Sequence, residues 1–287
     1  MNPRDVAIGA VCAAVIAGLA RRANSLSAGG AIAAFAVGTL TFAAGGLGFA
    51  LILLAFFVPS VLLSRLGRRR KRELVDVGKH GARDAVQVLV NGGVATACAV
   101  AWAVTHDPRW ACAFAGAYAA AAADTAATEI GTLARHRPRS ILTLRPVETG
   151  LSGAISLPGT LAEIVAAVWL GIAGLAGIAA AYWFGPDAGL AWPRSAESTS
   201  RLVPALLAIP LGGLAGATMD SLLGATLQEL RRCEACGRLC ETDPHVCGEP
   251  TRRVRGLPGF TNDAVNLLAT VTGAAVAYGV AAAALRP

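Results

Sequence analysis

The chain has 287 residues, of which 55% are hydrophobic and only 15% are charged, and its mean hydropathy is +0.56. A water-soluble domain carries about a quarter charged residues, so the composition excludes an ordinary soluble protein. The net charge of +7 does not predict a nucleic-acid partner, because basic residues collect in the cytoplasmic loops of membrane proteins.

Apolar runs of about 20 residues, the length needed to cross a bilayer, recur along the whole chain. We therefore expect an all-α fold, a polytopic transmembrane helix bundle that forms one domain over residues 1–287. Eight spans are expected, at residues 5–20, 28–44, 47–66, 85–105, 110–133, 158–184, 203–228 and 262–284. Ala and Gly dominate these runs, and small residues let helices approach closely in lipid. Residues 150–160 could form a re-entrant or broken helix in front of the sixth span.

The positions of Lys and Arg orient these spans. With the N-terminus outside, the inner loops hold twenty of the 25 Lys and Arg residues, including a basic run at residues 68–72. Basic loops face the cytoplasm, so both termini are expected outside the plasma (inner) membrane of a bacterium. The basic run is either a topology determinant beside anionic headgroups or an attractor for an anionic substrate.

Acidic residues stand at the cytoplasmic ends of the fifth and seventh spans. Asp124 and Glu129 end the fifth span, and Asp220 ends the seventh; a Gly precedes each Asp by eight residues and a hydroxyl residue follows it. Both spans run in the same direction, so the two aspartates should lie at similar depth, with Asp263 beside them at the start of the eighth span. An ionised Asp at membrane depth costs about 2.5–3.5 kcal/mol, so such residues usually serve an ion, a proton or a substrate. The alternative is a helix-end acid that faces water.

Polar residues from other segments are expected at the same membrane face. Arg83, Gln87 and Asn91 recur every four residues and share one helical face, where they bind a ligand or hydrogen-bond to neighbouring helices. Residues 149–153 follow Arg145 and can expose backbone N–H groups to a phosphate at a helix start, although they contain no Walker A sequence. The other candidates for substrate binding are Thr149, Ser152, Ser221, Gln228, Asn262 and Asn266.

A cysteine-rich segment at residues 231–260 is expected as a small cytosolic loop inserted between the last two spans. It contains a Cys-x-x-Cys pair and a His-x-Cys pair, namely Cys233, Cys236, His245 and Cys247. Four such ligands suit tetrahedral Zn²⁺ in a compartment where disulfides are disfavoured, with Cys240 either a spare thiol or a replacement for His245. Reduced cysteines without a metal are the alternative. A closed four-ligand site has no open position for catalysis, so a zinc ion here would be structural.

The separated motifs together resemble an integral-membrane family that includes the plant phytyl-phosphate kinase. The family is similar to the CTP-dependent dolichol and phytol kinases and to phosphatidate cytidylyltransferases. The segments that carry the resemblance are residues 81–93, 124–131, 145–156, 212–228 and 262–266. The most specific parts are Asp124-Thr-x-x-x-Glu129-x-Gly131 and Asp220-Ser221-x-x-Gly224. Residues 149–153 depart from the family pattern, which is nearer Gly-Thr-Asn-Gly.

The resemblance implies a membrane kinase that transfers a phosphoryl group from a nucleoside triphosphate, CTP or ATP, to a polyprenyl or phytyl monophosphate in the membrane. Arg83 and Arg145 would neutralise phosphate charge. Mg²⁺ would be bound by oxygen ligands, here Asp124, Glu129, Asp220 and Asp263. One alternative is a nucleotidyltransferase that forms a CDP-lipid. The other is an ion-coupled transporter, although a transporter should carry its polar residues near the membrane midplane.

Overall fold

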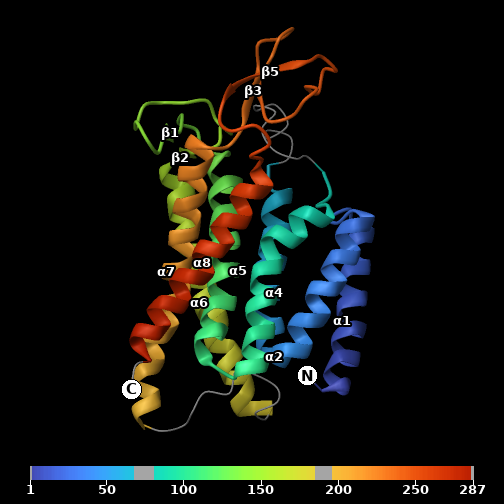
Figure 1. Cartoon of the computed structure of the whole chain (residues 1–287), viewed down its shortest axis with the longest axis vertical. Coiled ribbons are helices and arrows are strands. Elements are labelled where there is room, and N and C mark those ends of the chain that lie inside the picture. Colours follow the sequence, from blue (N-terminus) through green and yellow to red (C-terminus); the bar gives the residue numbers. More distant parts are fainter. Residues whose placement is uncertain (1, 68–80, 185–195, 286–287) are drawn as a thin grey trace.

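The computed structural model describes residues 2–67, 81–184 and 196–285, and helices make up most of these ranges (Figure 1). The helices of the described residues are α1 (Pro3–Arg22), α2 (Ala28–Arg65), α4 (Ala85–Thr105), α5 (Pro108–Gly131), α6 (Leu157–Phe184), α7 (Ala196–Thr226) and α8 (Asn262–Ala284). All of them except α5 are long and apolar enough to cross a membrane. The expected helical membrane bundle is confirmed, whereas the basic run at residues 68–72 lies outside the described residues.

Helix α2 contains the second and third expected spans as one folded-back element. Its helical geometry is interrupted at Gly45 and Gly46, and Gly46 has a φ of 58°, a conformation that only glycine adopts readily. At the far end of α2, the Arg65 guanidinium donates to the Ala23 carbonyl oxygen (3.1 Å) and to the Ser25 hydroxyl (2.9 Å). Since Ala23 and Ser25 precede the start of α2, both ends of α2 lie together and its halves run in opposite directions. The total of eight crossings stays a prediction.

Helix α5 is the centre of the bundle. Every residue from Ala111 to Ala123 is buried, because α2, α4, α6, α7 and α8 all contact this helix. A helix that other helices surround does not need a lipid-facing apolar surface. This position explains why an alanine-rich helix with an Asp near its end belongs to the bundle although it is less apolar than its neighbours.

Small residues allow α5, α7 and α8 to approach one another closely. A Cβ atom added at Gly116 would lie 2.7 Å from the Gly273 carbonyl oxygen, and one added at Gly212 would lie 2.5 Å from the same oxygen. Such distances leave no room for a side chain, as is typical of glycine-mediated packing in membranes. The packing holds the ends of α5 and α7 beside the start of α8.

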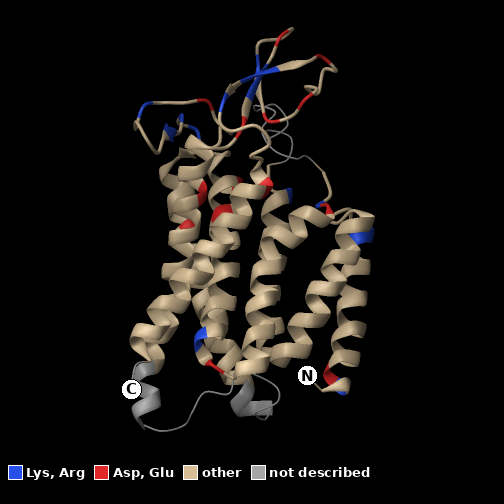
Figure 2. Cartoon of the chain, in the orientation of Figure 1, with Lys and Arg blue, Asp and Glu red and all other residues tan. Residues whose placement is uncertain are grey.

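Two small antiparallel sheets cover the end of the bundle where α5 and α7 finish and α6 and α8 begin. One sheet pairs β1 with β2, and the other has the strand order β4-β3-β5. Their bounds are β1 (Arg139–Ser140), β2 (Ala154–Ile155), β3 (Leu230–Cys233), β4 (Leu239–Cys240) and β5 (Thr251–Arg255). We call this the sheet end; Figure 2 shows that the coloured Lys and Arg residues gather there, while α1 begins and α8 finishes at the opposite end.

The sheets change two expectations about connecting segments. Residues 150–160 hold a turn, β2 and the first turn of α6, so the re-entrant or broken helix considered for them is not formed. The cysteine-rich segment expected as a loop contains β3, β4 and β5. Its treatment as an insertion into a single transmembrane domain stays a prediction.

Candidate functional site

A cavity of about 380 Å³ opens at the sheet end among α2, α4, α5, α6, α7 and α8. Its volume lies within the range of about 300–1,000 Å³ that is typical of ligand pockets. Most of the residues that the sequence predicts for metal or phosphate binding line it: Arg83, Gln87, Asn91, Asp124, Glu129, Thr149, Ser152, Asp220, Ser221, Asn262 and Asn266. Their chemical roles remain predictions, but the structure brings these side chains to one cavity.

Three predicted site residues do not line this cavity. Arg145 is exposed in the connection between β1 and β2, and Gln228 is buried between α7 and β3. Asp263 lies in the first turn of α8. Its neighbours Asn262 and Asn266 reach the cavity wall in its place.

Two carboxyl groups from parallel helices meet in the cavity. The carboxyl groups of Asp124 (α5) and Asp220 (α7) lie close enough to hydrogen-bond to each other if one of them is protonated. The Oδ2 atom of Asp220 is buried and has no hydrogen-bond partner among the residues that the structure describes. Two ionised carboxylates that lie this close together repel each other, so the pair requires either a shared proton or a bound cation.

Two further acids, which the sequence analysis missed, complete the cluster. Glu163 (α6) lines the cavity and interacts electrostatically with both Asp124 and Asp220. Glu241, directly after β4, also lines the cavity and interacts with Asp220. Glu163 could have been found as a lone acid inside an apolar span. Glu241 carried no such signal, because its place depends on how the cysteine-rich segment folds.

Arg83 brings a positive charge to the same cavity. Burial lowers the pKa of Arg83, and the nearby Glu129 carboxylate opposes that shift. Its backbone is fixed by two hydrogen bonds, from the Arg83 N–H to the Ser25 carbonyl oxygen (3.0 Å) and from the Ser27 N–H to the Arg83 carbonyl oxygen (2.9 Å). The residue is thus held between the α1–α2 turn and the start of α4, with a guanidinium suited to phosphate.

The other members of the polar stripe on α4 make bonds within their own helix. The Gln87 side-chain oxygen accepts from the Asp84 N–H (3.1 Å), and the Asp84 carboxylate accepts from the Gln87 N–H (2.9 Å). This capping box stabilises the start of α4. Asn91 donates to the Gln87 carbonyl oxygen (3.0 Å). Gln87 and Asn91 therefore have a structural role in addition to lining the cavity.

The segment that precedes β2 packs against the end of α7. Gly150 and Gly153 have φ angles of 92° and 80°, which other residues adopt only with strain. A Cβ atom added at Gly153 would lie 2.4 Å from the Ala225 Cβ atom. These glycines let residues 149–153 form one wall of the cavity close to Asp220.

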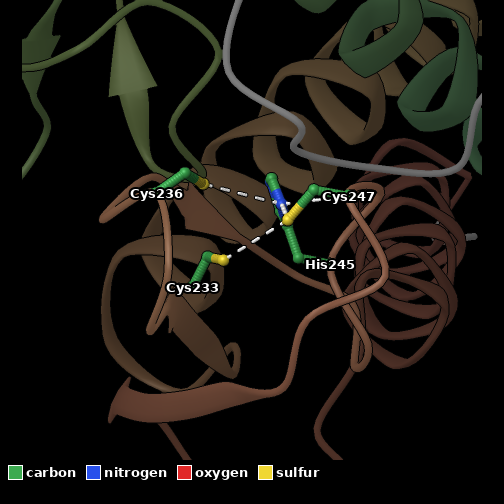
Figure 3. Close-up of side chains that lie close together, drawn as sticks. All are labelled: Cys233, Cys236, His245 and Cys247. Atoms are coloured by element: carbon green, nitrogen blue, oxygen red, sulfur yellow. Dashed lines mark hydrogen bonds between the residues drawn. The ribbon is translucent and has the colours of Figure 1, made fainter.

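The cysteine-rich segment holds a compact cluster of metal-ligating side chains (Figure 3). The ligand atoms of Cys233, Cys236, His245 and Cys247 all lie within 4.8 Å of one another. The Cys233 and Cys247 sulfurs are 3.6 Å apart. In a tetrahedral zinc site with Zn–S bonds of about 2.3 Å, two thiolate sulfurs are expected about 3.8 Å apart. The residues present therefore fit one Zn²⁺ ion.

The structure separates Cys240 from this cluster. Its thiol donates to the Thr242 carbonyl oxygen (3.6 Å), so His245 and not Cys240 joins the other three ligands. Nearby backbone N–H groups, foremost that of Cys236, hold the pKa of the Cys233 thiol below its ordinary value. A thiolate is the form that binds zinc.

Comparison with known proteins agrees with the resemblance noted in the motifs. Protein PGR of Arabidopsis thaliana is 29% identical over 279 residues, which cover 90% of this chain and 90% of that protein. An uncharacterized membrane protein of Methanocaldococcus jannaschii is 29% identical over 216 residues, or 75% of this chain and 79% of the relative.

Protein VTE6, chloroplastic, of Arabidopsis thaliana is 28% identical over 158 residues, which are 53% of this chain and 47% of that protein. No solved structure matches the chain significantly. The family described as "Integral membrane protein DUF92" matches residues 11–274. The chain therefore belongs to the DUF92 family of integral membrane proteins.

Proposed function

We propose that this protein is a membrane kinase that transfers the terminal phosphoryl group of a nucleoside triphosphate to a prenyl monophosphate. The observation that carries the proposal is the carboxyl pair of Asp124 and Asp220 in a cavity that Arg83 also lines. Phosphoryl transfer needs little covalent chemistry from the protein and depends on positioning and charge stabilisation. Carboxylates for a hard cation and a guanidinium for phosphate are the groups that this chemistry requires.

The carboxyl pair fits a divalent cation better than a purely structural role. The buried Oδ2 atom of Asp220, which lacks a partner among the described residues, is a ready oxygen ligand. Mg²⁺ bound at the pair would neutralise charge on the phosphates of the donor. Arg83 would bind the phosphate of the acceptor, and the backbone of residues 149–153 would hold the donor phosphates against the end of α7.

A second, apolar cavity supports a lipid as the acceptor. This cavity of about 90 Å³ lies among α1, α2, α4 and α5, and it shares Arg83, Gln87 and Asn91 with the larger cavity. Its other walls are mainly apolar side chains, together with the buried Tyr118. A polar cavity that continues into an apolar one suits a phosphate attached to a hydrocarbon. Since a cavity of about 150 Å³ accommodates benzene, the smaller one suits about one five-carbon isoprene unit.

We place the sheet end on the cytoplasmic side of the membrane. The Lys and Arg residues that gather there (Figure 2) support this orientation, since basic loops remain in the cytoplasm. Nucleoside triphosphates would then reach the larger cavity from the cytosol, and the prenyl chain would enter from the bilayer.

The test is product analysis with the purified protein in lipid nanodiscs and Mg²⁺. Prenyl monophosphates of several lengths are incubated with CTP or ATP that is labelled at either the γ- or the α-phosphate. The proposal predicts that the γ-label appears in a prenyl diphosphate. Transfer of the α-label would instead show a nucleotidyltransferase that forms a CDP-lipid, and the absence of any labelled lipid would reject both activities.

A further inference from the structure

Glu241 connects the Cys/His cluster to the carboxyl pair. We refer to residues 230–255, which contain β3, β4, β5 and the cluster, as the Cys/His module. Glu241 follows the last residue of β4 and lines the larger cavity, where it accepts a hydrogen bond from the Ser152 hydroxyl. It also interacts electrostatically with Asp220 and with Arg255.

The module is fastened to the membrane bundle beside Asp220. The Arg255 guanidinium donates to the Gly224 carbonyl oxygen near the end of α7 (2.8 Å) and to the Ser152 carbonyl oxygen (3.4 Å). Just outside the module, the Glu229 carboxylate accepts from the Gly259 N–H (2.7 Å), which joins the two chain segments that lead into and out of the module. The Arg255 bonds hold the module against the end of α7, one turn beyond Asp220, and against residues 149–153 of the cavity wall.

The Cys/His cluster encloses the stretch of chain that carries Glu241. Two of its ligands, Cys233 and Cys236, precede this stretch, and the other two, His245 and Cys247, follow it. Between them, the Asp243 carboxylate accepts from the Arg231 guanidinium (2.8 Å). A metal bound by all four ligands would therefore close a loop around Glu241 and fix its backbone.

We propose that Glu241 is a further ligand of the cation site formed by Asp124 and Asp220, and that metal binding in the Cys/His module holds it there. Asp220 supplies the independent evidence for a ligand, because its Oδ2 atom is buried in the cluster without a partner among the described residues. A third carboxylate would bring the site closer to the several oxygen ligands that a divalent cation takes. The inference rests on the cation site of the proposed function. It adds that cation binding at this site depends on a metal bound in the module.

The first test measures Mn²⁺ binding, as a paramagnetic substitute for Mg²⁺, by electron paramagnetic resonance on the purified zinc-loaded protein. No nucleotide or lipid is present. Glu241→Gln should weaken Mn²⁺ binding at least about tenfold, the lower end of the effect of removing groups that support a metal site. Glu249→Gln is the matched control, because Glu249 is an exposed acid of the same module and should leave the affinity unchanged. Parent-like binding by Glu241→Gln, or no binding by the parent protein, would overturn the inference.

The second test asks whether the module acts through Glu241. Cys236→Ser should release zinc and weaken Mn²⁺ binding as much as Glu241→Gln does. The double variant Cys236→Ser/Glu241→Gln should be no weaker than either single variant, because both changes remove the same interaction. If Cys236→Ser has lost its zinc, keeps the helix content of the parent and still binds Mn²⁺ with the parent's affinity, the module does not position Glu241.

These binding results are separable from the proposed activity. Loss of Mn²⁺ binding in Glu241→Gln, in a protein that transfers no phosphoryl group, would contradict the kinase proposal alone. If the parent protein transfers the phosphoryl group and Glu241→Gln binds Mn²⁺ as tightly as the parent does, this inference alone is contradicted.

Discussion

The carboxyl groups of Asp124 and Asp220 lie within hydrogen-bonding reach of each other although they belong to different helices, α5 and α7. The two helices run in the same direction and approach closely through small residues, so both side chains arrive at the same depth. Ordinary helix packing does not require two acids to meet in this way, and their repulsion opposes it. A cation bound between the two carboxylates would offset this repulsion. The first three predictions below test the helix packing, the zinc cluster and the apolar cavity.

The first prediction concerns the glycine contact between α5 and α8. A Cβ atom at Gly273 would lie 2.7 Å from both the Ala120 Cβ atom and the Gly116 carbonyl oxygen. Gly273→Ala should therefore lower the melting temperature of the purified protein, since overpacking costs about 1–3 kcal/mol. Gly279→Ala is the matched control on the same helix, because a Cβ atom there meets nothing within 4 Å. Equal melting temperatures for the two variants would show that the helices are not packed at Gly273 as described.

The second prediction concerns the metal content of the Cys/His module. Protein purified without added zinc should contain about one zinc ion per chain, because the four ligand atoms lie within 4.8 Å of one another. Elemental analysis should find that Cys236→Ala loses this zinc, whereas Cys240→Ala keeps it, since the Cys240 thiol bonds to Thr242 outside the cluster. Loss of zinc should spare the helix content of the bundle, whose spans satisfy their own backbone hydrogen bonds. If the parent protein contains no zinc and Cys236→Ala is as stable as the parent, the cysteines are reduced thiols without a metal.

The third prediction concerns the apolar cavity. Ala34 of α2 lines that cavity, whereas Ala36 of the same helix is exposed on the outside of the bundle. Ala34→Leu should fill the cavity and raise the KM for a prenyl monophosphate by about tenfold, the equivalent of losing the burial of roughly two methylene groups. The KM for the nucleotide should not change. If Ala36→Leu has the same effect as Ala34→Leu, or neither variant has any, the prenyl chain binds elsewhere.

The sequence was most informative where periodicity and position along a span decide the structure. The apolar runs predicted the helices, and the matching Gly and Asp positions in the fifth and seventh spans predicted that Asp124 and Asp220 would meet. The Cys-x-x-Cys and His-x-Cys pairs predicted the cluster, although the spacing left His245 and Cys240 as alternatives. Geometry decided between them, because the Cys240 thiol turns toward Thr242.

The remaining features depend on contacts that no local pattern contains. The meeting of Glu241 with Ser152 and Asp220 depends on how a small sheet sits on the end of α7. Likewise, the fold-back of α2 at Gly46 joins two predicted spans into one element. Arg145 had the right charge for phosphate, but it lies in an exposed connection away from the cavity lining.

The central claim is that a cation at Asp124 and Asp220 carries the chemistry, and Asp124→Asn tests it most directly. This change removes one negative charge and nearly preserves the shape of the side chain, so the bundle should fold, since a neutral amide is no harder to bury in a membrane than a carboxylate. Asp5→Asn is the control, because Asp5 lies in the first turn of α1, at the end of the bundle opposite the cavity.

The measurement is the rate of Mg²⁺-dependent transfer of the labelled γ-phosphate to a prenyl monophosphate by folded protein in nanodiscs. Loss of a metal ligand should raise the barrier by several kcal/mol, at about tenfold in rate for each 1.4 kcal/mol. We therefore predict that Asp124→Asn and Asp220→Asn are slower by a factor of at least about 100, while Asp5→Asn matches the parent. A well-folded Asp124→Asn protein that transfers phosphate as fast as the parent would contradict the claim and leave Asp124 as an acid at the end of a helix.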